Sequence, residues 1–557
     1  MKKKFISTVL ALVLTAGLLT GCSNASTTQT TAGGDSATAA TTDSTSATTD
    51  ATTDEHTLTI ALTNSFEALD PIHGYGTEID SVLNNITEGL FYYDHDGVVQ
   101  PLIAESYTQP DSTTYVYKIR DDVKFSDGTP LTVEDVIFSL ERHRSTTNPS
   151  ELGWMFANVD TITKTGDWEV TVKLKQADPV WQDTLATSAG LVISKTYYEA
   201  HADNFGTAEG GIIGSGPYIL SNWAAGSQIE LVKNDNYWNP DTTLDFTKLI
   251  FKIIPDETVQ EEALQSGQVD FIFSPSVDTI ETLEADDSIV ISQVDTFLSW
   301  FLSFNTSREP FNDVNVRKAI SYAIDKKTIV DNVFKGYAVT PNALPFGQSI
   351  VAADVDNKAS WDAYYAKIKT YDYNLDTAKE YLAKSSVPDG FSTTLNYVAD
   401  DSVQETVALA IQQNLAELNI NVELIATPWS ELNIYRYGGS ETRDYDLMLT
   451  IWGSDYPDPT GTIVPMYDSA NIVAGGSNWA EYRNDAFDKL VDQQATAATS
   501  AERATYLQQA LDIIAEDVPY IPVYNPNSIF ATNARIQYDF SSSALYNLYF
   551  KDFKLAK

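Results

Sequence analysis

The sequence predicts an α/β protein of several domains. The chain has 557 residues, and the part able to fold, from about His56 onward, is long enough for roughly two to four domains with substantial cores. Strand-like runs such as "TLTIAL" and "YVYKIR" come early, whereas strand and helix patterns alternate later. No fixed-period repeat is visible. Such alternation favours a sheet covered by helices, in which ligands bind outside the carboxyl ends of the strands.

The predicted elements follow in chain order. Near the middle, "VRKAISYAIDKKTIVDNVF" places apolar residues at helical spacing and predicts a helix that stops at Gly336. Further on, "FSTTLNYVA" indicates a strand, residues 402–418 a helix, and "NVELIAT" and "YDLMLTIW" two more strands. The segment "GSDYPDP" directly follows the last strand, so its carboxylates are candidates for a binding loop.

Two earlier stretches predict loops. The glycine cluster "GGIIGSGPY" at 210–218 has the wrong order for a dinucleotide loop and runs into the strand-like "YILSNW", which indicates a structural loop. In "FSDGTPLT", Asp127 and Gly128 predict a tight turn. Thr132 and Asp135 then predict a capping box at the start of a helix.

Residues 1–22 have the anatomy of a secretory signal peptide. A basic "MKKK" precedes a short apolar stretch from Phe5 to Thr20, and "LTGC" closes it. The stretch is shorter than the roughly 20 apolar residues that a spanning helix needs. "LTGC" also resembles the lipobox of bacterial lipoproteins, in which Cys22 would be lipidated and form the new N-terminus. The alternative is a coincidental cysteine in an ordinary signal peptide.

Composition narrows the function further. Cys22 is the only cysteine, so the exported part has no disulfide, no thiol nucleophile and no cysteine metal ligand. Residues 23–55 are predicted to be a disordered Ser/Thr/Ala tether, because up to Thr53 they contain no aromatic residue and no apolar side chain larger than Ala. The formal net charge of −42 excludes nucleic acid as a partner.

Catalytic motifs are scarce. The sequence contains no G-x-S-x-G elbow, no H-E-x-x-H, no P-loop and no EF-hand pattern. We therefore expect no enzyme activity, no cofactor and no metal site. A hydrolase that uses a pair of carboxylates stays an alternative, because sequence alone does not exclude such a pair. A site that needs a histidine from a C-terminal lobe is disfavoured, since all histidines come early: His56, His73, His95, His143 and His201.

Eight segments carry a family resemblance, and they occur in the same order as in that family. They are "NITEGLFYYD", "VKFSDGTPLTVEDVIFSLER", "GSGPYILSNW", "NDNYWNP", "ALQSGQVDFI", "SFNTSREPFNDVNVRKAISYAIDKKTIV", "YNLDTAKEYLAKS" and "YDLMLTIWGSDYPDP". In this order they resemble the oligopeptide- and dipeptide-binding proteins of ABC transporters, the family 5 extracellular solute-binding proteins. The resemblance covers the chain from about His56 to its C-terminus.

The resemblance implies a two-lobed periplasmic-binding-protein-like fold of type II, whose hinge closes the lobes over the ligand. It implies a monomeric receptor that delivers di- or oligopeptides to an ABC transporter permease. A lipid on Cys22 would anchor it to the extracytoplasmic face of a bacterial cell membrane, as in Gram-positive bacteria. An oligosaccharide or a metal complex is the alternative ligand. The expected domains are a main domain of lobe 1 at 56–94, 214–303 and 526–557, an inserted domain at 95–213, and lobe 2 at 304–525.

The resemblance also implies ligand contacts after the last predicted strand. In peptide-binding members an aspartate of a W-x-x-D loop takes the ligand's ammonium, and Asp455 stands at that place in "WGSD". A buried ammonium is expensive to desolvate without such a carboxylate. Asp458, which lies between two prolines, is instead expected to be a turn residue. The strand end beside the peptide corresponds to Ile451, Trp452, Gly453 and Ser454.

Further contacts are implied on both lobes. Trp429 corresponds to an aromatic residue that lines the pocket, and Arg436 to an arginine able to pair with a peptide carboxylate. Arg443 is an equally reachable candidate, because the segment after Arg436 looks longer than in oligopeptide binders. A surface salt bridge is the alternative for either arginine. The lobe 1 loop "IHGYGTEID" is expected to face the ligand through Gly74, Tyr75 and Gly76. The alternative is that this loop is a plain surface turn.

Overall fold

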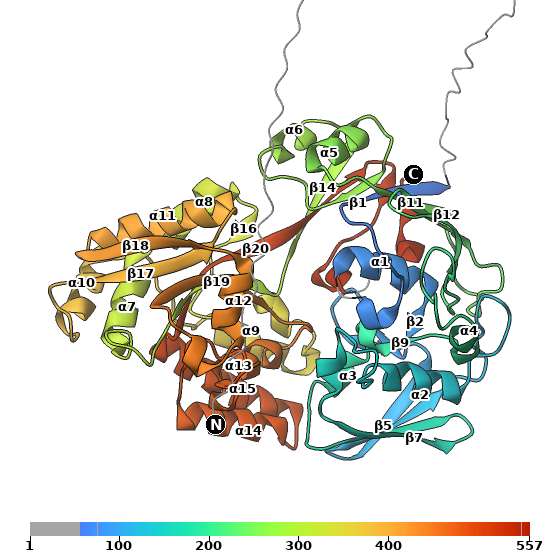
Figure 1. Ribbon diagram of the computed structural model, residues 1–557, viewed down its shortest axis with the longest axis horizontal. Coiled ribbons are helices and arrows are strands. Elements are labelled where there is room, and N and C mark those ends of the chain that lie inside the picture. Colours follow the sequence, from blue (N-terminus) through green and yellow to red (C-terminus); the bar gives the residue numbers. More distant parts are fainter. Residues whose placement is uncertain (1–55, 75, 547) are drawn as a thin grey trace, which may run out of the picture. The chain divides into compact units, whose positions relative to one another are not determined.

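The fold is given by a computed structural model that describes residues 56–74, 76–546 and 548–557 (Figure 1). The expected signal peptide and tether, with Cys22, and also Tyr75 lie outside these residues. The described part is mixed α/β structure around one large sheet, which confirms the predicted fold class. None of its helices is both long and apolar enough to cross a membrane.

One half of a twelve-stranded sheet belongs to lobe 1, the lobe that contains the first strand. This strand, β1 (Thr57–Leu62), is buried throughout and pairs in parallel with β12 (Lys248–Ile253) and β13 (Phe271–Phe273). It is the predicted "TLTIAL" strand. Three further strands of this half lie antiparallel to their partners: β10 (Tyr218–Ala224), β11 (Gln228–Lys233) and β14 (Ile289–Asp295).

The other half of the sheet belongs to lobe 2. β17 (Phe391–Val398) pairs in parallel with β18 (Ile420–Thr427) and β19 (Leu447–Gly453). β15 (Leu298–Phe304) lies antiparallel to β19 along its full length. The three strands predicted for this region are thereby confirmed. The segment "GSDYPDP" extends from the carboxyl end of β19, where ligands of parallel α/β sheets tend to bind.

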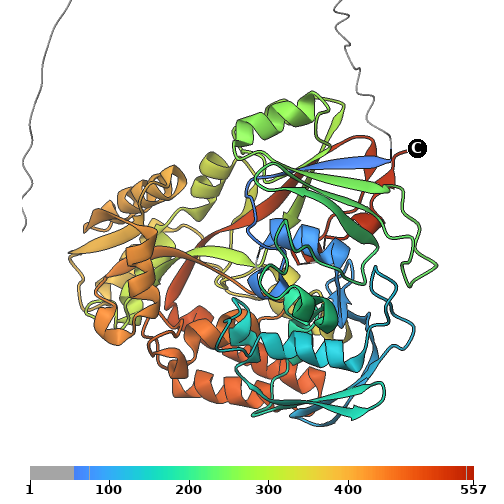
Figure 2. The same ribbon diagram turned by 45° about the vertical axis from the view of Figure 1, so that its right-hand side comes forward.

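The long strand β20 (Tyr520–Asn533) joins the two lobes, and Figures 1 and 2 show it running from one to the other. Its first residues pair with β15 in lobe 2, and its last residues pair with β13 and β14 in lobe 1. Between these regions, Asn525 and Pro526 pair with the short strand β16 (Ala338–Val339).

A second connection between the lobes runs from the end of β14 at Asp295 to the start of β15 at Leu298. Because β15 pairs with β19 and with the first part of β20, it lies in the sheet of lobe 2. We therefore propose that the chain enters lobe 2 at 295–298 rather than at the expected position of 303–304. The expected return near residue 526 stays a prediction.

The region expected as an inserted domain carries its own sheet. Its helix α2 (Val133–Arg142) begins with the predicted capping box, in which Thr132 and Asp135 each accept a hydrogen bond from the other's backbone amide. The four antiparallel strands lie in the order β5 (Ala104–Asp111), β6 (Thr114–Ile119), β8 (Glu169–Leu174) and β7 (Val159–Gly166). Short elements precede or follow this four-stranded sheet in the chain: β2 (Glu88–Gly89), β3 (Phe91–Tyr93), β4 (Val99–Pro101), α3 (Trp181–Thr184), β9 (Leu191–Val192) and α4 (Lys195–Ala200).

The helix predicted up to Gly336 is wrong in its continuity. The chain leaves helical geometry at Ile324, whose ψ is 117°, and the side chain of Asp325 caps a new helix by accepting from the amide of Thr328. Apolar periodicity alone missed this break, because both pieces face the same core of lobe 2. The two helices are α7 (Val314–Ala323) and α8 (Lys326–Phe334).

The remaining helices pack around the sheet, as Figures 1 and 2 show. Lobe 1 contains α1 (Thr77–Ile86), α5 (Glu257–Gln265) and α6 (Ile280–Glu284), and a C-terminal pair of short strands, β21 (Ile536–Gln537) and β22 (Lys554–Leu555). Lobe 2 contains α9 (Lys358–Tyr365), α10 (Leu375–Ala383), α11 (Ser402–Ala416), α12 (Trp429–Tyr437), α13 (Thr460–Tyr467), α14 (Asp485–Ala495) and α15 (Ser500–Asp517).

Candidate binding site

The loop after β19 is closed by its own hydrogen bonds. Trp452 Nε1 donates to the carbonyl of Gly461 at 3.0 Å, and Ser454 Oγ donates to the carbonyl of Tyr456 at 2.5 Å. The backbone amide of Asp458 donates to the same carbonyl of Tyr456 at 2.8 Å. Only glycine fits at position 461, since a Cβ there would lie 2.0 Å from Ser454 Oγ. The 454–461 loop is therefore compact and stiff.

Asp455 stands in this loop between two buried residues, Ser454 and Tyr456, and is itself half-buried. Its neighbours on both sides are fixed by the hydrogen bonds of the loop. A carboxylate that is partly withdrawn from water and held on a stiff backbone suits the capture of a cationic group. The predicted role of Asp455 is compatible with this position and stays a prediction.

Asp458 has the turn role that its flanking prolines predict. Its Oδ1 accepts from the backbone amide of Thr460 at 2.8 Å. An unpredicted partner adds to this, because Arg503 in α15 donates from Nη1 and Nη2 to the two carboxylate oxygens, both at 2.8 Å. Burial raises the pKa of Asp458, but the charge and hydrogen bonds of Arg503 outweigh burial and bring the pKa below its ordinary value. Asp458 thus anchors the loop to lobe 2.

Several polar groups of the predicted strand end are used inside the protein. The carbonyl of Ile451 accepts from Arg436 Nη2 at 3.1 Å, and the carbonyl of Ser454 accepts from Tyr546 Oη at 2.8 Å. Gly453 lies so close to Leu298 that a Cβ there would be 2.3 Å from its Cδ2. The strand end therefore shapes the site more through its packing than through unused backbone groups.

Arg436 lies in an aromatic cage on α12. Its Cζ is 4.9 Å from the ring centroid of Trp429, 5.0 Å from that of Tyr437 and 4.3 Å from that of Trp479. Trp429 is 40 % exposed, whereas Arg436 is buried. Burial lowers the pKa of Arg436. Arg436 Nε and Trp479 Nε1 are buried and have no hydrogen-bond acceptor in the described part of the chain. The cage therefore contains two unused hydrogen-bond donors.

Arg443 has a different environment. Its Nη1 donates to Glu481 Oε1 at 2.6 Å, and its Nη2 donates to the carbonyls of Arg436 and Gly476. The Arg443 side chain is 0 % exposed and that of Glu481 8 %. The alternative of a salt bridge is thus realised for Arg443, in the interior instead of at the surface. Of the two candidate arginines, Arg436 is the one without an internal carboxylate partner among the described residues.

The lobe 1 loop lies at the carboxyl end of β1. Gly76 has φ +142°, a conformation that favours glycine, and precedes α1. A Cβ at Gly74 would lie 2.7 Å from Leu83 Cδ1, so a larger residue there would displace the end of the Leu83 side chain. Gly76 borders a cavity of about 510 Å³ together with Thr63, Glu78, Phe273 and other residues. Whether this loop meets the ligand stays a prediction, and Tyr75 lies outside the described residues.

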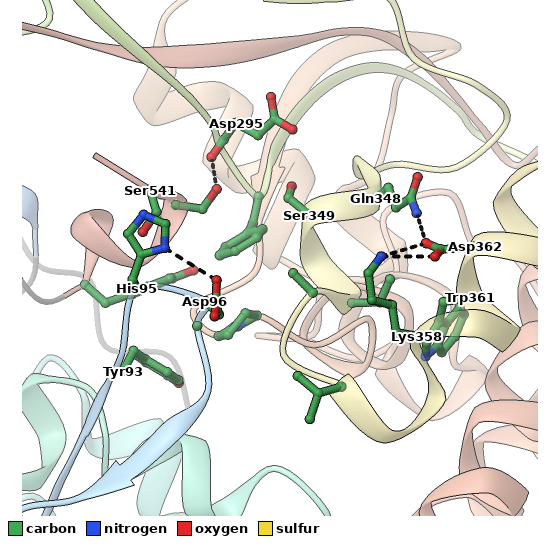
Figure 3. A pocket seen from close by; sticks show the side chains of 18 residues that line it. Tyr93, His95, Asp96, Asp295, Gln348, Ser349, Lys358, Trp361, Asp362 and Ser541 are labelled. Atoms are coloured by element: carbon green, nitrogen blue, oxygen red, sulfur yellow. Dashed lines mark hydrogen bonds and ion pairs between the residues drawn. The ribbon is translucent and has the colours of Figure 1, made fainter. Parts of the chain in front are cut away.

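A second cavity, of about 490 Å³, lies between the lobes (Figure 3). Residues from five separate segments line it, and four of these segments are the β3–β4 turn with His95, the connection that includes Phe297, the region from Gln348 to Asp362, and the C-terminal region with Tyr546. Pro457 of the 454–461 loop borders the same cavity. Its volume falls within the roughly 300–1,000 Å³ that is usual for small-molecule sites.

Aromatic side chains line part of this cavity, and its lysine is paired with an aspartate. The rings of Phe297 and Tyr546 stack at 5.8 Å. Lys358 Nζ and Gln348 Nε2 both donate to Asp362, at 3.0 to 3.1 Å and 2.8 Å, as Figure 3 shows. Sequence reasoning missed this cavity, because its wall comes from segments far apart in the chain that carry no motif. Within residues 56–557, apart from the two positions left undescribed, no group of three or more His, Cys, Asp or Glu side chains is placed to hold a metal ion.

Comparison with known proteins agrees with this architecture. The sequence profile of the bacterial extracellular solute-binding proteins, family 5 Middle, matches residues 98–473, which is more than half of the chain. The chain therefore belongs to the family 5 extracellular solute-binding proteins, which bind solutes outside the cytoplasm and work with ABC transporters.

Individual relatives are distant in sequence and close in fold. The chain is 26 % identical over 468 residues to the glutathione-binding protein GsiB of Escherichia coli K12, covering 84 % of this chain and 88 % of GsiB. The structure of HbpA2 from Haemophilus parasuis gives a TM-score of 0.79 at 23 % identity, over 90 % of this chain and 100 % of that one. The oligopeptide-binding protein AppA of Bacillus subtilis, in complex with a nonapeptide, gives 0.67 at 25 % identity, over 90 % and 99 %.

Proposed function

We propose that this chain is a receptor that binds a peptide between its lobes and delivers it to an ABC transporter permease. The observation that carries the proposal is the cavity of about 490 Å³ that both lobes line beside the loop of Asp455. Two similar proteins, one named for glutathione and one bound to a nonapeptide, support a ligand of peptide type. We expect the receptor to have no enzymatic role.

The site residues divide the peptide's charged ends between them. Asp455 takes the ammonium, because a partly buried cation needs a carboxylate. Arg436 takes the carboxylate, and Trp429 covers it, since this guanidinium has no carboxylate partner among the described residues, whereas Arg443 pairs with Glu481. The peptide backbone lies along the strand end, and loop 74–76 of lobe 1 approaches it from the other side. The strand end comprises Ile451, Trp452, Gly453 and Ser454.

The cellular setting is proposed from the sequence. Cys22 carries the lipid anchor, and residues 23–55 tether a monomeric receptor to the extracytoplasmic face of the membrane. The domain limits keep the inserted domain at 95–213 and lobe 2 up to 525, with entry into lobe 2 at 295–298.

A non-peptide solute, such as an oligosaccharide or a metal complex, is the second candidate within the same class. The aromatic side chains of the interlobe cavity favour such a solute, because aromatic rings also pack against sugar rings and ring-bearing chelates. A carboxylate hydrolase is the remaining alternative from a different class, and it would convert its ligand during incubation.

Native mass spectrometry of the purified chain tests the ligand class. A closed two-lobed receptor retains its ligand, so we expect a family of bound masses whose spacings equal amino-acid residues. A bound mass with sugar spacing or a metal isotope pattern would replace the peptide by the second candidate. Release of cleaved products from a peptide or glycan panel would contradict the receptor function altogether.

A further inference from the structure

We infer that Tyr456 is a positioning residue that docks the loop of Asp455 onto the inserted domain and thereby holds the two lobes together. Asp455 and Tyr456 are adjacent in the chain. The residue proposed to hold the ligand and the residue that contacts the opposite lobe therefore move as one unit. The consequence for binding rests on the proposed function, whereas the contact itself needs no ligand.

The ring of Tyr456 is part of the core of the other lobe. Tyr456 is 9 % exposed and belongs to an apolar cluster whose other buried members all come from residues 90–192. Among these are Tyr93, Val180 and Trp181. Among the described residues, one buried side chain of lobe 2 thus completes a core whose other buried members belong to lobe 1.

Two further contacts hold the same loop to lobe 1. Tyr546 Oη donates to the carbonyl of Ser454 at 2.8 Å. Gly97, in the β3–β4 turn, faces Pro457, since a Cβ at Gly97 would lie 3.7 Å from Pro457 Cγ and 3.8 Å from Pro457 Cβ. Residues on both sides of Tyr456 therefore contact lobe 1. The docking of the loop does not depend on the side-chain conformation of Tyr456 alone.

On its own lobe, Tyr456 has little freedom to withdraw. A Cβ at Gly461 would come within 2.9 Å of the Tyr456 ring, so the ring rests on this glycine. The pair of Asp458 and Arg503 fixes the backbone two residues further on. When the lobes separate, the stiff loop presents the ring to water, which the hydrophobic effect opposes. The loop thus favours the closed arrangement.

Disulfide trapping tests this contact. The distance of 3.8 Å between the Cβ positions of residues 97 and 457 equals the usual Cβ separation of a disulfide. We therefore expect the full chain carrying Gly97→Cys, Pro457→Cys and Cys22→Ala to form this crosslink under mild oxidation without added ligand. Adding Tyr456→Ala should slow crosslinking about tenfold or more, and Tyr456→Phe should leave the rate near that of the parent.

The matched control is Tyr373→Ala, which removes an equally large ring that is 45 % exposed on the same lobe and should not change the crosslinking rate. If Tyr456→Ala crosslinks as fast as this control, or if no disulfide forms in the parent, the inference is overturned. Fluorescence energy transfer between labels on Thr163→Cys and Glu417→Cys, in the Cys22→Ala background, avoids the strain of a side chain at Gly97, whose φ is +79°. There, Tyr456→Ala should lengthen the distance between the lobes, and an unchanged distance would also overturn the inference.

The same variants separate this inference from the proposed function. The trapping is measured without added solute on chain that has been unfolded and refolded to remove any retained ligand, so its result does not depend on what the ligand is. If only the closed form binds the ligand tightly, Tyr456→Ala should raise the apparent Kd for a probe tripeptide, Ala-Ala-Ala. The rise should be in proportion to the loss of the closed population. Failure of the tripeptide to bind, with intact trapping, would contradict the ligand class and leave the contact of Tyr456 established.

Discussion

Arg436 and Arg443 are both buried arginines, and they have different partners. Arg443 pairs with Glu481 in the interior. Arg436 is surrounded by three aromatic rings and carbonyl or amide oxygens. A buried charge without a counterion is costly unless a ligand supplies one. The structure therefore separates two candidates that the sequence leaves equal.

Replacing Arg443 is expected to reduce stability. Arg443→Gln leaves Glu481 buried without its cation, and breaking such a pair costs about 3–5 kcal/mol. Thermal or urea unfolding measures the loss. Arg308→Gln is the matched control, because the pairs of Arg308 are largely exposed and should be worth less than about 1 kcal/mol. Equal stability of the two variants would contradict the structural role of Arg443.

Replacing Arg436 is expected to reduce affinity instead. Arg436→Gln should weaken the binding of a peptide with a free C-terminal carboxylate by about 2–5 kcal/mol, the scale for removing one partner of a buried charge pair. Binding of the same peptide with an amidated C-terminus should change little. Calorimetry on both peptides provides the comparison. Equal losses for both would assign Arg436 to the fold and not to the ligand carboxylate.

At the scale of elements, local patterns were sufficient where local chemistry decides. The strand β1, the capping box of α2 and the turn at Asp127, whose Oδ1 accepts from the amide of Thr129 at 2.9 Å, all follow from neighbouring residues. The break between α7 and α8 was missed because Asp325 acts as a cap inside an apolar pattern that continues across it.

The contacts of the site depend on tertiary structure and could not be predicted from the sequence. Arg503 lies 45 residues after Asp458, and no spacing rule connects them. Tyr456 looks like an ordinary loop residue in "SDYPDP", and only the packed structure brings it into the core of the other lobe. The family resemblance supplied the position of Asp455, which composition and periodicity do not single out.

The contact of the 454–461 loop with α3 is expected to depend on pH. Burial raises the pKa of Asp183 to about 7, the charge of Asp458 adds to this rise, and Arg503 opposes it. Asp178 also raises it, and Tyr93 Oη lies 3.4 Å from Asp183 Oδ1 as a donor. Three further tyrosines interact electrostatically with the Asp183 carboxyl: Tyr107, Tyr115 and Tyr456.

The sign of the effect follows from proton binding. An aspartate that titrates near 4 when unfolded and near 7 in the native state binds more protons in the native state between these values, so stability falls as the pH rises across that window. We expect Asp183→Asn to lose less melting temperature between pH 5 and pH 8 than the parent does. Burial lowers the pKa of His143 to about 3, and this histidine opposes the slope below about pH 6.5 equally in both proteins. Part of the slope should remain, because burial also raises the pKa of Asp80 to about 7. An equal change of melting temperature with pH in parent and variant would contradict the assignment of this pH dependence to Asp183.

At the scale of the whole described part, two connections link the lobes, β20 and the segment from Asp295 to Leu298. Such paired crossings allow hinge bending, with φ/ψ changes confined to a few residues. The interlobe cavity and the docking of Tyr456 both depend on the arrangement of the lobes. Binding of a solute that contacts both lobes should therefore stabilise the chain by mass action, about 2.7 kcal/mol at a ligand concentration of 100 Kd.

We propose that a ligand ammonium lies against Asp455 when the lobes close. Calorimetric titration of a free-amine peptide into the parent and into Asp455→Asn tests it most directly. We predict a loss of about 2–5 kcal/mol in binding free energy for the variant, and no such difference between the two proteins for the N-acetylated peptide. An unchanged affinity of Asp455→Asn for the free-amine peptide, with an intact fold, would contradict the claim.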